Sequence, residues 1–491
     1  MKVILSTRLK NIFLIIITLS AIVYLYLQWS FQSQLSLFES DDLKSNYIKD
    51  IGFTVEEEYD VDGQVADSEK TDDKFTELED GIYHNFEVDR VISPVFEARQ
   101  YADKNNLPFI LWWTPFTGEK GKLKKCFIGE CYFTIDRQLY NHNATMALLF
   151  YGSNFNGNDL PLPRKKLHEW GLLHEESPKN QALFMFQDIM ELFNYTSTFK
   201  QQSSYPISTQ YIVSESYLLK PSVYTVSEKN WMKETLDLAS IAYIQTGCNP
   251  PSDRDAYVQE LMKYIRVDSY GKCLHNKDLP VELNSPSKMN SKAFIEFIGK
   301  YKFVLSFENA ICNDYITEKL FRTFNMGSIP IYKGAPNIRD WLPDDHSAII
   351  VDDFNSPKDL ADYINFVDSN STVYEQYLEY KTIGLRNPIL NKALSERQWG
   401  VKSFYRMSYV TGFECYVCDQ IHSNLKLMQE GKLPIKHQAT FEHYGCPKPE
   451  KYNYSDIPGA FDWERNIWLW EYEKAKKNSV LLKEKVYSTL E

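Results

Sequence analysis

The sequence predicts an α/β protein with two doubly wound, parallel-sheet domains, preceded by a single N-terminal transmembrane helix and a disordered acidic stem. Three observations lead to this prediction. Residues 12–28 carry no charge, whereas residues 56–80 hold twelve acidic and two basic side chains. From Leu107 onward, short apolar runs alternate with amphipathic stretches long enough to form helices. Strands separated by helix-length segments are typical of parallel α/β sheets.

The composition of the 491 residues limits the kinds of protein that the chain can be. Hydrophobic residues make up 43% and charged residues 24%, which is ordinary globular usage and excludes a collagenous, low-complexity or wholly disordered chain. The formal net charge of −12 offers no basic footprint, so we expect no nucleic-acid partner. The length favours about two to three domains.

The uncharged N-terminal run is long enough to cross a bilayer. Lys2, Arg8 and Lys10 precede it and acidic residues follow it, so the short N-terminus is predicted to stay cytoplasmic. We therefore expect a cytoplasmic tail at 1–11 and a signal anchor at 12–29. The protein would be a single-pass type II protein of the Golgi or endoplasmic reticulum membrane with a lumenal body. A cleaved signal peptide is the alternative, but no small-x-small cleavage site follows the apolar run.

The cysteines and glycosylation motifs fit an oxidising compartment. An even number of cysteines beyond the apolar run predicts disulfides, whose pairing the sequence cannot give. The eight candidates are Cys126, Cys131, Cys248, Cys273, Cys312, Cys415, Cys418 and Cys446. Four N-x-S/T motifs predict a secretory-pathway glycoprotein. They begin at Asn143, Asn194, Asn370 and Asn453.

Two series of apolar runs mark the two expected domains. We expect an acidic stem at 30–104, domains at 105–235 and 236–398, and a cysteine-containing C-terminal extension at 399–491. The stem holds too few apolar residues to offset the entropy of ordering it. The predicted strands are Phe109–Trp113, Met146–Tyr151, Gly171–His174 and Ile189–Tyr195, then Ile241–Gln245, Tyr264–Asp268, Phe303–Phe307, Ser328–Tyr332 and Ala348–Val351. The helices predicted in the second series are Arg254–Lys263, Ser291–Tyr301, Tyr315–Asn325 and Ile338–Leu342.

The segment after the strand Phe303–Phe307 offers the first candidate site. In open α/β sheets, ligands bind at the carboxyl ends of strands, facing helix N-termini. Asp314 is a candidate N-cap of the next helix, which places Glu318 and Lys319 in its first turns. Glu318 suits the helix dipole but Lys319 opposes it, as expected if the lysine reaches an anion such as a phosphate. An ordinary surface lysine is the alternative.

A second cation stands at the start of another predicted helix. Arg254 follows the strand Ile241–Gln245, so two strand-to-helix turns could clamp a pyrophosphate. Asp253 and Asp255 also form a D-x-D, a pattern that can bind a divalent metal. A helix N-cap at Asp253 is the preferred interpretation of that motif.

Glu175 and Glu176 follow a predicted strand of the first domain. Adjacent residues alternate faces, so we expect only one of these carboxylates to point inward. That carboxylate could act as a general base facing the other domain. A helix N-terminal cap is the simpler alternative.

Cysteine and histidine spacing near the C-terminus, Cys415-x-x-Cys418 and His443-x-x-Cys446, can hold zinc. In an oxidising lumen, disulfides to the other cysteines are the preferred interpretation. The patterns G-x-G-x-x-G, G-x-x-x-x-G-K-[ST] and G-x-S-x-G are absent from the sequence. This argues against Rossmann dinucleotide, P-loop and nucleophile-elbow chemistry.

Several of these segments resemble a known family. FENAICNDYITEK, at 307–319, is similar to the F-E-N-x…D-Y-x-T-E-K signature of α-1,3-fucosyltransferases, glycosyltransferase family ten. CNPPSDRDAYV, at 248–258, resembles the family's donor-site turn, and HEESPKN and FNYTSTF, at 174–180 and 193–199, resemble its acceptor-side segments. The resemblance runs from about residue 107 to 448 and is closest to the fucosyltransferase 10/11 branch.

The resemblance implies a GT-B architecture with two facing Rossmann-like domains, and inverting transfer of L-fucose from GDP-fucose to a hydroxyl acceptor. It implies that Arg254 and Lys319 neutralise the departing pyrophosphate. Because these cations supply the charge, neither a metal nor another cofactor is expected. Glu176 matches the family's candidate base for the acceptor hydroxyl.

The resemblance also assigns the rest of the donor site. Asn309, Tyr315 and Glu318 would hold the ribose and fucose region of GDP-fucose. Glu318 would in addition stabilise oxocarbenium-like charge on the fucose as it is transferred.

The acceptor side departs from the family pattern. Many members carry Tyr-Arg and an acidic pair where this chain has Phe199–Ser204. The expected acceptor is therefore either GlcNAc of a glycoprotein glycan, in α-1,3 linkage, or Ser/Thr of a folded protein domain. A catalytically silent lumenal glycoprotein-binding or quality-control protein with the same fold is the alternative.

Overall fold

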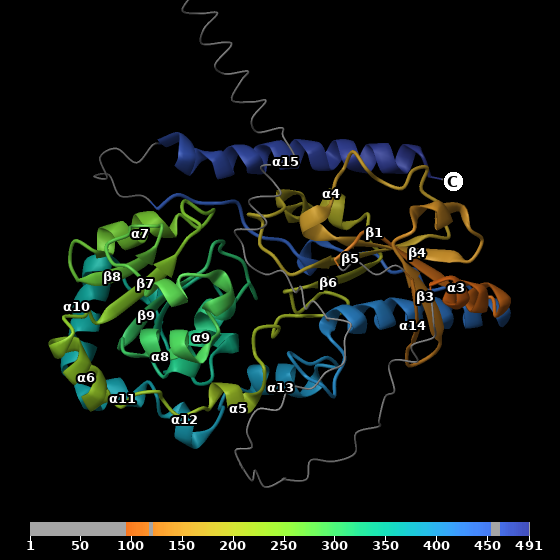
Figure 1. The fold of residues 1–491 in the computed structure, drawn as a ribbon. Coiled ribbons are helices and arrows are strands. Elements are labelled where there is room, and N and C mark those ends of the chain that lie inside the picture. The colour runs from red at the N-terminus through yellow and green to blue at the C-terminus, as the bar shows by residue number, and fades with distance from the viewer. Residues whose placement is uncertain (1–94, 117–120, 453–461, 491) are drawn as a thin grey trace, which may run out of the picture. The chain divides into compact units, whose positions relative to one another are not determined.

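The structure is a computed structural model that describes residues 95–116, 121–452 and 462–490 (Figure 1). The predicted tail, anchor and acidic run, and the motif at Asn453, lie outside the described residues. The chain divides into two units, Met1–Glu79 with Pro280–Ser291, and Asp80–Leu279 with Lys292–Glu491. The described part of the first unit carries two short 3₁₀ turns, and both sheets belong to the second unit.

The prediction of a single-pass type II membrane anchor, with Golgi or endoplasmic reticulum localisation, is corrected by the structure. Within the ranges described above, no helix is both long and apolar enough to cross a membrane. The long helices α14 (Tyr409–Gln429) and α15 (Asp462–Ser488) carry charged side chains, such as Glu414 and Asp419, where a spanning helix needs apolar ones. The predicted span 12–29 itself is not among the described residues.

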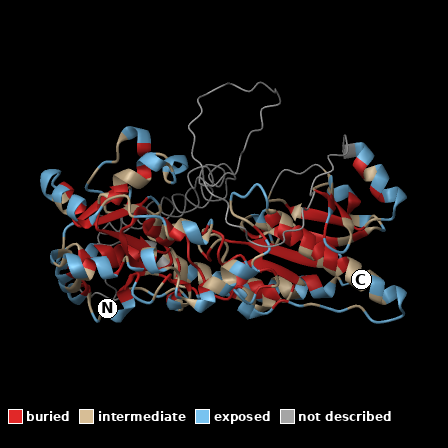
Figure 2. Ribbon diagram, turned by 90° about the horizontal axis from the view of Figure 1, so that it is seen from below, coloured by how far each residue is buried: buried red, intermediate tan, exposed pale blue. Residues whose placement is uncertain are grey.

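The first sheet has six strands in the order β2-β3-β1-β4-β5-β6. The strands are β1 Phe109–Thr114, β2 Lys122–Lys125, β3 Glu130–Thr134, β4 Thr145–Tyr151, β5 Glu169–His174 and β6 Tyr195–Thr198. All neighbours are parallel except β2, which runs antiparallel to β3. The central strands are buried almost throughout (Figure 2), as expected for parallel strands covered on both faces.

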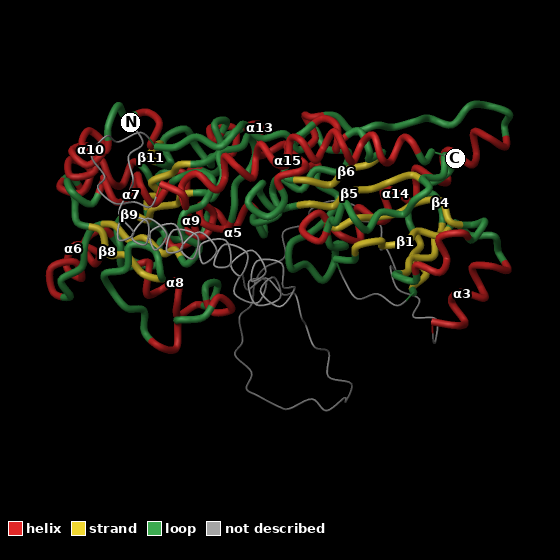
Figure 3. Tube along the Cα trace, turned by 90° about the horizontal axis from the view of Figure 1, so that it is seen from above, coloured by secondary structure: helices red, strands yellow, loops and turns green. Residues whose placement is uncertain are grey.

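The second sheet has five parallel strands in the order β11-β10-β9-β7-β8. The strands are β7 Ile241–Gln245, β8 Val267–Gly271, β9 Phe303–Phe307, β10 Ile329–Lys333 and β11 Ile349–Ile350. Figure 3 shows both groups of strands in yellow among red helices. The predicted α/β class with parallel sheets is confirmed.

Helices connect and cover the strands. Beside α14 and α15 they are α3 Val95–Lys104, α4 Gln187–Met190, α5 Glu215–Leu218, α6 Val226–Thr235, α7 Arg254–Leu261, α8 Lys292–Gly299, α9 Glu318–Met326, α10 Pro357–Ser369, α11 Ser371–Gln376, α12 Tyr380–Ile383 and α13 Pro388–Glu396. Helix α3 falls within the stretch predicted as stem, and it buries Ala98 and Ala102. The packed body therefore begins ahead of residue 105.

Two predicted strands differ from the structure. The run Ile189–Tyr195 is wrong as a strand, because its start belongs to α4 and β6 begins only at Tyr195. A short apolar run fits a buried helical turn as well as a strand. The strand predicted at Tyr264–Asp268 lies three residues later, as β8.

Helix α14 of the C-terminal extension packs on the first sheet. Phe413 and Val417 join the same buried cluster as Ile110 of β1. Beneath them the Lys124 ammonium lies 2.5 Å from Glu414, which also accepts a 2.7 Å hydrogen bond from Trp112. The extension is thus part of the packed body.

Candidate active site

The predicted site residues lie in the loops at the carboxyl ends of β5, β7 and β9 and in the first turns of α7 and α9. The β7 and β9 loops are joined directly, because Ser252 donates its N–H to the Asn309 carbonyl at 3.0 Å and its hydroxyl to the Glu308 carbonyl at 2.7 Å. Glu176, after β5, lies within electrostatic reach of Lys319 and Glu318 at the start of α9. The structure therefore brings residues of both sheets to one site, as expected where parallel strands end.

Arg254, the first residue of α7, is held at the end of the second sheet. Its side chain is 3% exposed. Nη1 donates to the Phe307 carbonyl at 2.7 Å, and Nη2 donates to Gln245 Oε1 at 2.6 Å and to the Gly247 carbonyl at 3.1 Å. Nε is buried and has no hydrogen-bond partner among the described residues. Because these partners are neutral, the guanidinium charge is available to an anion.

Lys319 is fixed by a small network at the start of α9. Its Nζ donates to Thr317 Oγ1 at 2.8 Å and lies 3.4 Å from carboxylate oxygens of both Glu308 and Glu318. Glu308 is fully buried and accepts hydrogen bonds from the N–H and the hydroxyl of Thr317, at 2.7 Å and 2.8 Å. Burial raises the pKa of Glu308, although the Lys319 charge opposes that shift.

Glu318 remains ionised beside this lysine. Burial alone would raise the pKa of Glu318. The charges of Lys319 and Arg322, helped by hydrogen bonds to the carboxylate, outweigh burial, so the pKa lies below the ordinary value. A fixed negative charge therefore stands at the first position of α9.

The predicted N-cap of this helix is corrected by the structure. Asp314 adopts a left-handed conformation with φ of 64°, and Thr317 occupies the N-cap position. The Asp314 carboxylate accepts hydrogen bonds from Gln201, Asn337 and Trp341. It therefore joins the loop after β6 to the donor-side loop, a contact that local sequence cannot reveal.

The adjacent glutamates after β5 have different surroundings. Glu175 accepts a 2.9 Å hydrogen bond from Tyr151, and burial, followed by the neighbouring Glu176 charge, raises its pKa to about 8. Glu176 is half-buried and is influenced by Lys319, Glu318 and Lys179. Burial raises the pKa of Glu176, with the lysine charges opposing that shift. A carboxylate with a raised pKa is a better proton acceptor near neutral pH.

Asn309 and Tyr315 lie in the same neighbourhood. Asn309 Oδ1 is buried and finds no hydrogen-bond partner in the described part of the chain. Tyr315 is 3% exposed and its ring packs edge-on against Phe199, with centroids 5.1 Å apart. Burial raises the pKa of Tyr315 far above its usual range, and the nearby Glu176 charge adds to that shift, so the phenol stays neutral.

Some residues of the site were not predicted as such. Tyr444, in the C-terminal extension, donates its hydroxyl to the Glu176 carbonyl at 2.9 Å. Its ring stacks on His174, and the nearby Cys446 forms a disulfide with Cys312 of the β9 loop. No local pattern around residue 444 signals this contact, because its partner lies 268 positions away. Lys179 belongs to the H-E-E-S-P-K-N segment, but the motif predicts no role for it.

The D-x-D carboxylates are engaged separately. Asp253 takes the N-cap position of α7, as preferred, although it makes no side-chain capping bond and accepts instead from the Tyr452 N–H. Asp255 accepts from the Tyr243 hydroxyl at 2.7 Å and from the Asn249 N–H at 2.6 Å. The two carboxylates thus have separate partners, and Asp253 occupies the N-cap position by its backbone alone.

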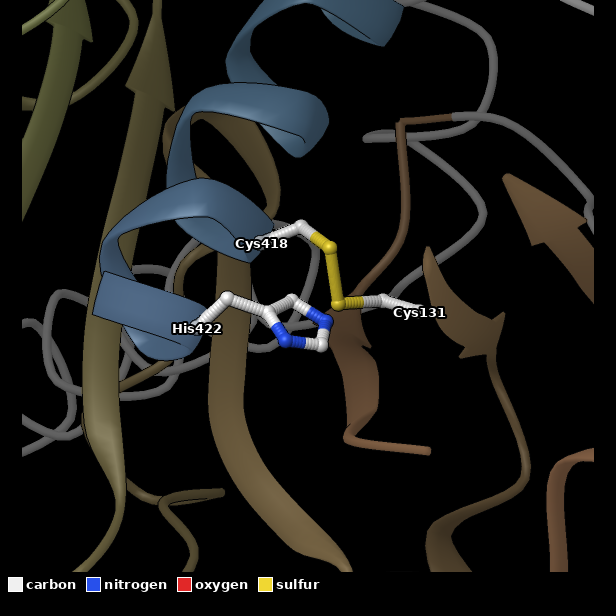
Figure 4. Close-up of side chains that lie close together, drawn as sticks. All are labelled: Cys131, Cys418 and His422. Atoms are coloured by element: carbon white, nitrogen blue, oxygen red, sulfur yellow. A yellow bond between two sulfur atoms is a disulfide. The ribbon is translucent and has the colours of Figure 1, made fainter. Parts of the chain in front are cut away.

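All eight cysteines form disulfides, which confirms the preferred interpretation over zinc. The pairs are Cys126–Cys415, Cys131–Cys418, Cys248–Cys273 and Cys312–Cys446. Figure 4 shows the His422 ring beside the Cys131–Cys418 bond. A zinc site built on these cysteines would need them as thiolates, and disulfide sulfur cannot supply that ligand. The C-x-x-C and H-x-x-C halves of the candidate zinc motif also bond to different parts of the chain, because Cys446 pairs with the loop after β9.

Three of the four glycosylation motifs lie in described segments. Asn143 is exposed, and Asn370 caps α11 by accepting from the Val373 N–H. The Asn194 amide donates to the His437 carbonyl at 2.8 Å and accepts from the Trp170 N–H at 2.8 Å. Modification at each of these positions stays a prediction.

Comparison with known proteins gives consistent relatives. Residues 105–211 match the family described as "Fucosyltransferase, N-terminal", and residues 236–432 match "Glycosyltransferase family 10 (fucosyltransferase) C-term". A Xenopus laevis protein named GDP-fucose protein O-fucosyltransferase 3 is 46% identical over 383 residues, covering 77% of this chain and 81% of its own. The Homo sapiens protein of that name is 42% identical over 418 residues, covering 85% and 87%.

Among solved structures, an α1,3-fucosyltransferase with GDP is 15% identical, covers 65% of this chain and 90% of its own, and has a TM-score of 0.37. The family therefore rests on the sequence matches, which span both sheets and every predicted donor-site residue. They confirm the resemblance stated from the motifs. The chain belongs to glycosyltransferase family 10, the fucosyltransferases.

Proposed function

We propose that this protein transfers L-fucose from GDP-fucose to a serine or threonine hydroxyl of a folded protein, with inversion at the anomeric carbon. The observation that carries the proposal is the convergence of Arg254 and Lys319 with the carboxylate of Glu176. The names of the relatives favour a protein acceptor over a glycan GlcNAc.

The cations on the second sheet suit the leaving group. As the fucose C1–O bond breaks, negative charge accumulates on the diphosphate, and Arg254 and Lys319 would stabilise it in the transition state. The buried Nε of Arg254 and Oδ1 of Asn309 have no partners among the described residues. Bound donor would satisfy both, through a phosphate oxygen and a ribose hydroxyl respectively, which removes the cost of leaving them unpaired.

The carboxylates suit the other half of the reaction. Glu176 would take the proton from the acceptor hydroxyl as its oxygen bonds to the anomeric carbon on the face opposite GDP. The negative charge of Glu318 would stabilise the oxocarbenium-like fucose between them. The neutral Tyr315, which lies close to both carboxylates, would form one wall of this part of the donor site.

We assign the two sheets to the two facing Rossmann-like domains of a GT-B enzyme. In this assignment the second sheet binds GDP-fucose and the first sheet supplies the base and meets the acceptor. The parallel strands of the second sheet, the parallel strands β3, β1, β4, β5 and β6 of the first, and the position of the candidate site at the strand ends support it.

No divalent metal is expected to take part, because Arg254 and Lys319 already supply positive charge to the diphosphate. Treatment with EDTA should therefore leave the rate of fucose transfer unchanged, measured as GDP release before and after chelation. Loss of activity on chelation, restored by Mg²⁺ or Mn²⁺, would contradict this expectation.

The test is an acceptor screen with purified protein and GDP-fucose. Folded cysteine-rich protein domains and GlcNAc-bearing glycopeptides would be incubated separately, and fucose addition would be followed by mass spectrometry with GDP release as a second readout. We expect fucose on serine or threonine of a folded domain. Fucose only on glycans would overturn the acceptor assignment. A catalytically silent protein would show neither transfer nor GDP-fucose hydrolysis, but the intact Glu176, Arg254 and Lys319 disfavour that alternative.

A further inference from the structure

Lys179 is a cation of the candidate site whose ammonium group has no partner among the described residues. It lies in the loop after β5, three residues beyond Glu176, and is half-buried. Its backbone N–H is bound by Ser177 Oγ at 3.3 Å. Its ammonium group makes no hydrogen bond or ion pair with any residue that the structure describes.

The ammonium lies against the turn that follows β7. Lys179 Nζ is 3.1 Å from the position that a Cβ atom would take on Gly247. The Gly247 carbonyl accepts the 3.1 Å hydrogen bond from Arg254 Nη2. The absence of a side chain on Gly247 thus lets two cations, one from each sheet, meet at the same turn.

This cluster is electrostatically unfavourable as it stands. Burial lowers the pKa of Lys179, and the Arg254 and Lys319 charges lower it further, while Glu176 and Asp255 act in the opposite direction. Asp255 is occupied by Tyr243 and Asn249. Lys319 is paired with Glu308 and Glu318, whereas Lys179 and Arg254 make no ion pair with any described residue. Two neighbouring cations without ion-pair partners favour an anion bound between them.

We propose that Lys179 binds the diphosphate of GDP-fucose as a third cation, approaching it from the first sheet while Arg254 and Lys319 approach from the second. This inference deepens the proposed function and rests on it. The ligand chemistry is a nucleoside diphosphate. Because Lys179 and Glu176 share one loop, donor binding would also hold the base in place for the acceptor.

A role through Glu176 alone is the competing explanation. In that case the Lys179 charge would only lower the pKa of Glu176, and the donor would not touch it. The two explanations differ in what they predict for GDP, which carries the diphosphate but takes no proton from the acceptor.

The test measures the affinity of the full chain for GDP and for guanosine by calorimetry. Lys179→Met should weaken GDP binding by about 10- to 100-fold, the range for a hydrogen bond to a charged group, with guanosine binding unchanged. Lys179→Arg should restore most of the GDP affinity. Lys166→Met is the matched control, since it removes an exposed lysine from the same domain and should change neither affinity.

Removal of an unpaired cation should not unfold the protein, so the variants should keep the thermal midpoint of the unsubstituted chain. Lys179→Gln, which retains a polar end, provides a second variant with the same expected loss. Unchanged GDP affinity in both variants, with the acid limb of the kcat profile moved to higher pH, would overturn the proposal. Absence of GDP binding by the unsubstituted chain would instead overturn the proposed function itself.

Discussion

At the scale of single residues, surroundings separate two neighbouring carboxylates. Glu175 faces into the first sheet and is bound by Tyr151, whereas Glu176 faces Lys319 and Glu318 on the second sheet. Sequence reasoning could expect one of the pair to point inward, but it could not supply the charges that surround it. The charges of Glu318 and Lys319 come from the start of α9, more than 140 positions away along the chain.

With Glu176 as the proposed base, its raised pKa predicts a pH dependence of the reaction. The base must be ionised, so activity should fall as the pH drops through its pKa, which burial places above the ordinary 4.5. The measurement is kcat/KM for fucose transfer across acidic pH. An acid limb at or below pH 4.5 would contradict a buried glutamate as the base.

Glu175 should affect stability in a defined pH window. Its pKa of about 8 in the folded state exceeds the ordinary 4.5, so the folded state holds the proton more tightly. Its contribution to stability is present below pH 4.5 and is lost as the pH rises through about 8. Glu175→Gln, which can still accept from Tyr151, should therefore raise the thermal midpoint at about pH 9 and not at about pH 4. Equal shifts at both pH values would refute this explanation.

At the scale of elements, the motifs predicted which candidate cations open helices, but they misplaced a helix cap. Arg254 does open α7, and Lys319 does lie in the first turn of α9. Asp314 was wrong as N-cap, because its carboxylate is used by Gln201, Asn337 and Trp341. Capping preferences are local, whereas this carboxylate is bound by residues brought close only by the fold.

The C-terminal extension is the segment whose structure and contacts the sequence predicted least well. It supplies α14, which is joined to the first sheet by two disulfides, and Tyr444, which holds the Glu176 carbonyl. The cysteine count predicted disulfides, but pairings across 134 to 289 positions require the folded chain.

The Cys312–Cys446 bond should matter for activity as well as stability. Replacing both cysteines with serine should cost about 2–4 kcal/mol of unfolding free energy and should also lower kcat, because the bond holds the Tyr444 segment beside Glu176. Chemical denaturation and fucose transfer would be measured together.

The matched control for that experiment is the Cys131–Cys418 pair, which joins β3 to α14. Its double serine variant should lose a similar free energy of unfolding and keep kcat in the protein that remains folded. Equal effects of the two pairs on kcat would show that the Cys312–Cys446 bond has no specific role at the site.

At the scale of the whole molecule, neither sheet carries a complete site. The first sheet contributes Glu176 and Lys179, and the second contributes Arg254, Glu318 and Lys319. The alternation of apolar runs predicted both sheets, and the family motifs supplied most of the candidate site residues. Lys179, whose ammonium group has no partner among the described residues, and the C-terminal contact at Tyr444 depend on the folded arrangement of both sheets.

The charge of the chain is also divided unevenly. Of the net −12, residues 56–80 account for −10, so the described body is close to neutral overall. The charges proposed to take part in its chemistry are the few cations and carboxylates at the candidate site.

The most direct test of this account is Glu176→Gln, assayed for both GDP affinity and fucose transfer to a folded protein acceptor. The variant should bind GDP with the affinity of the unsubstituted chain, because the donor cations are untouched. Its transfer rate should fall by about 10²- to 10⁴-fold, the range for loss of a general base. A variant that binds GDP and transfers fucose at an undiminished rate would contradict the assignment of Glu176 as the base.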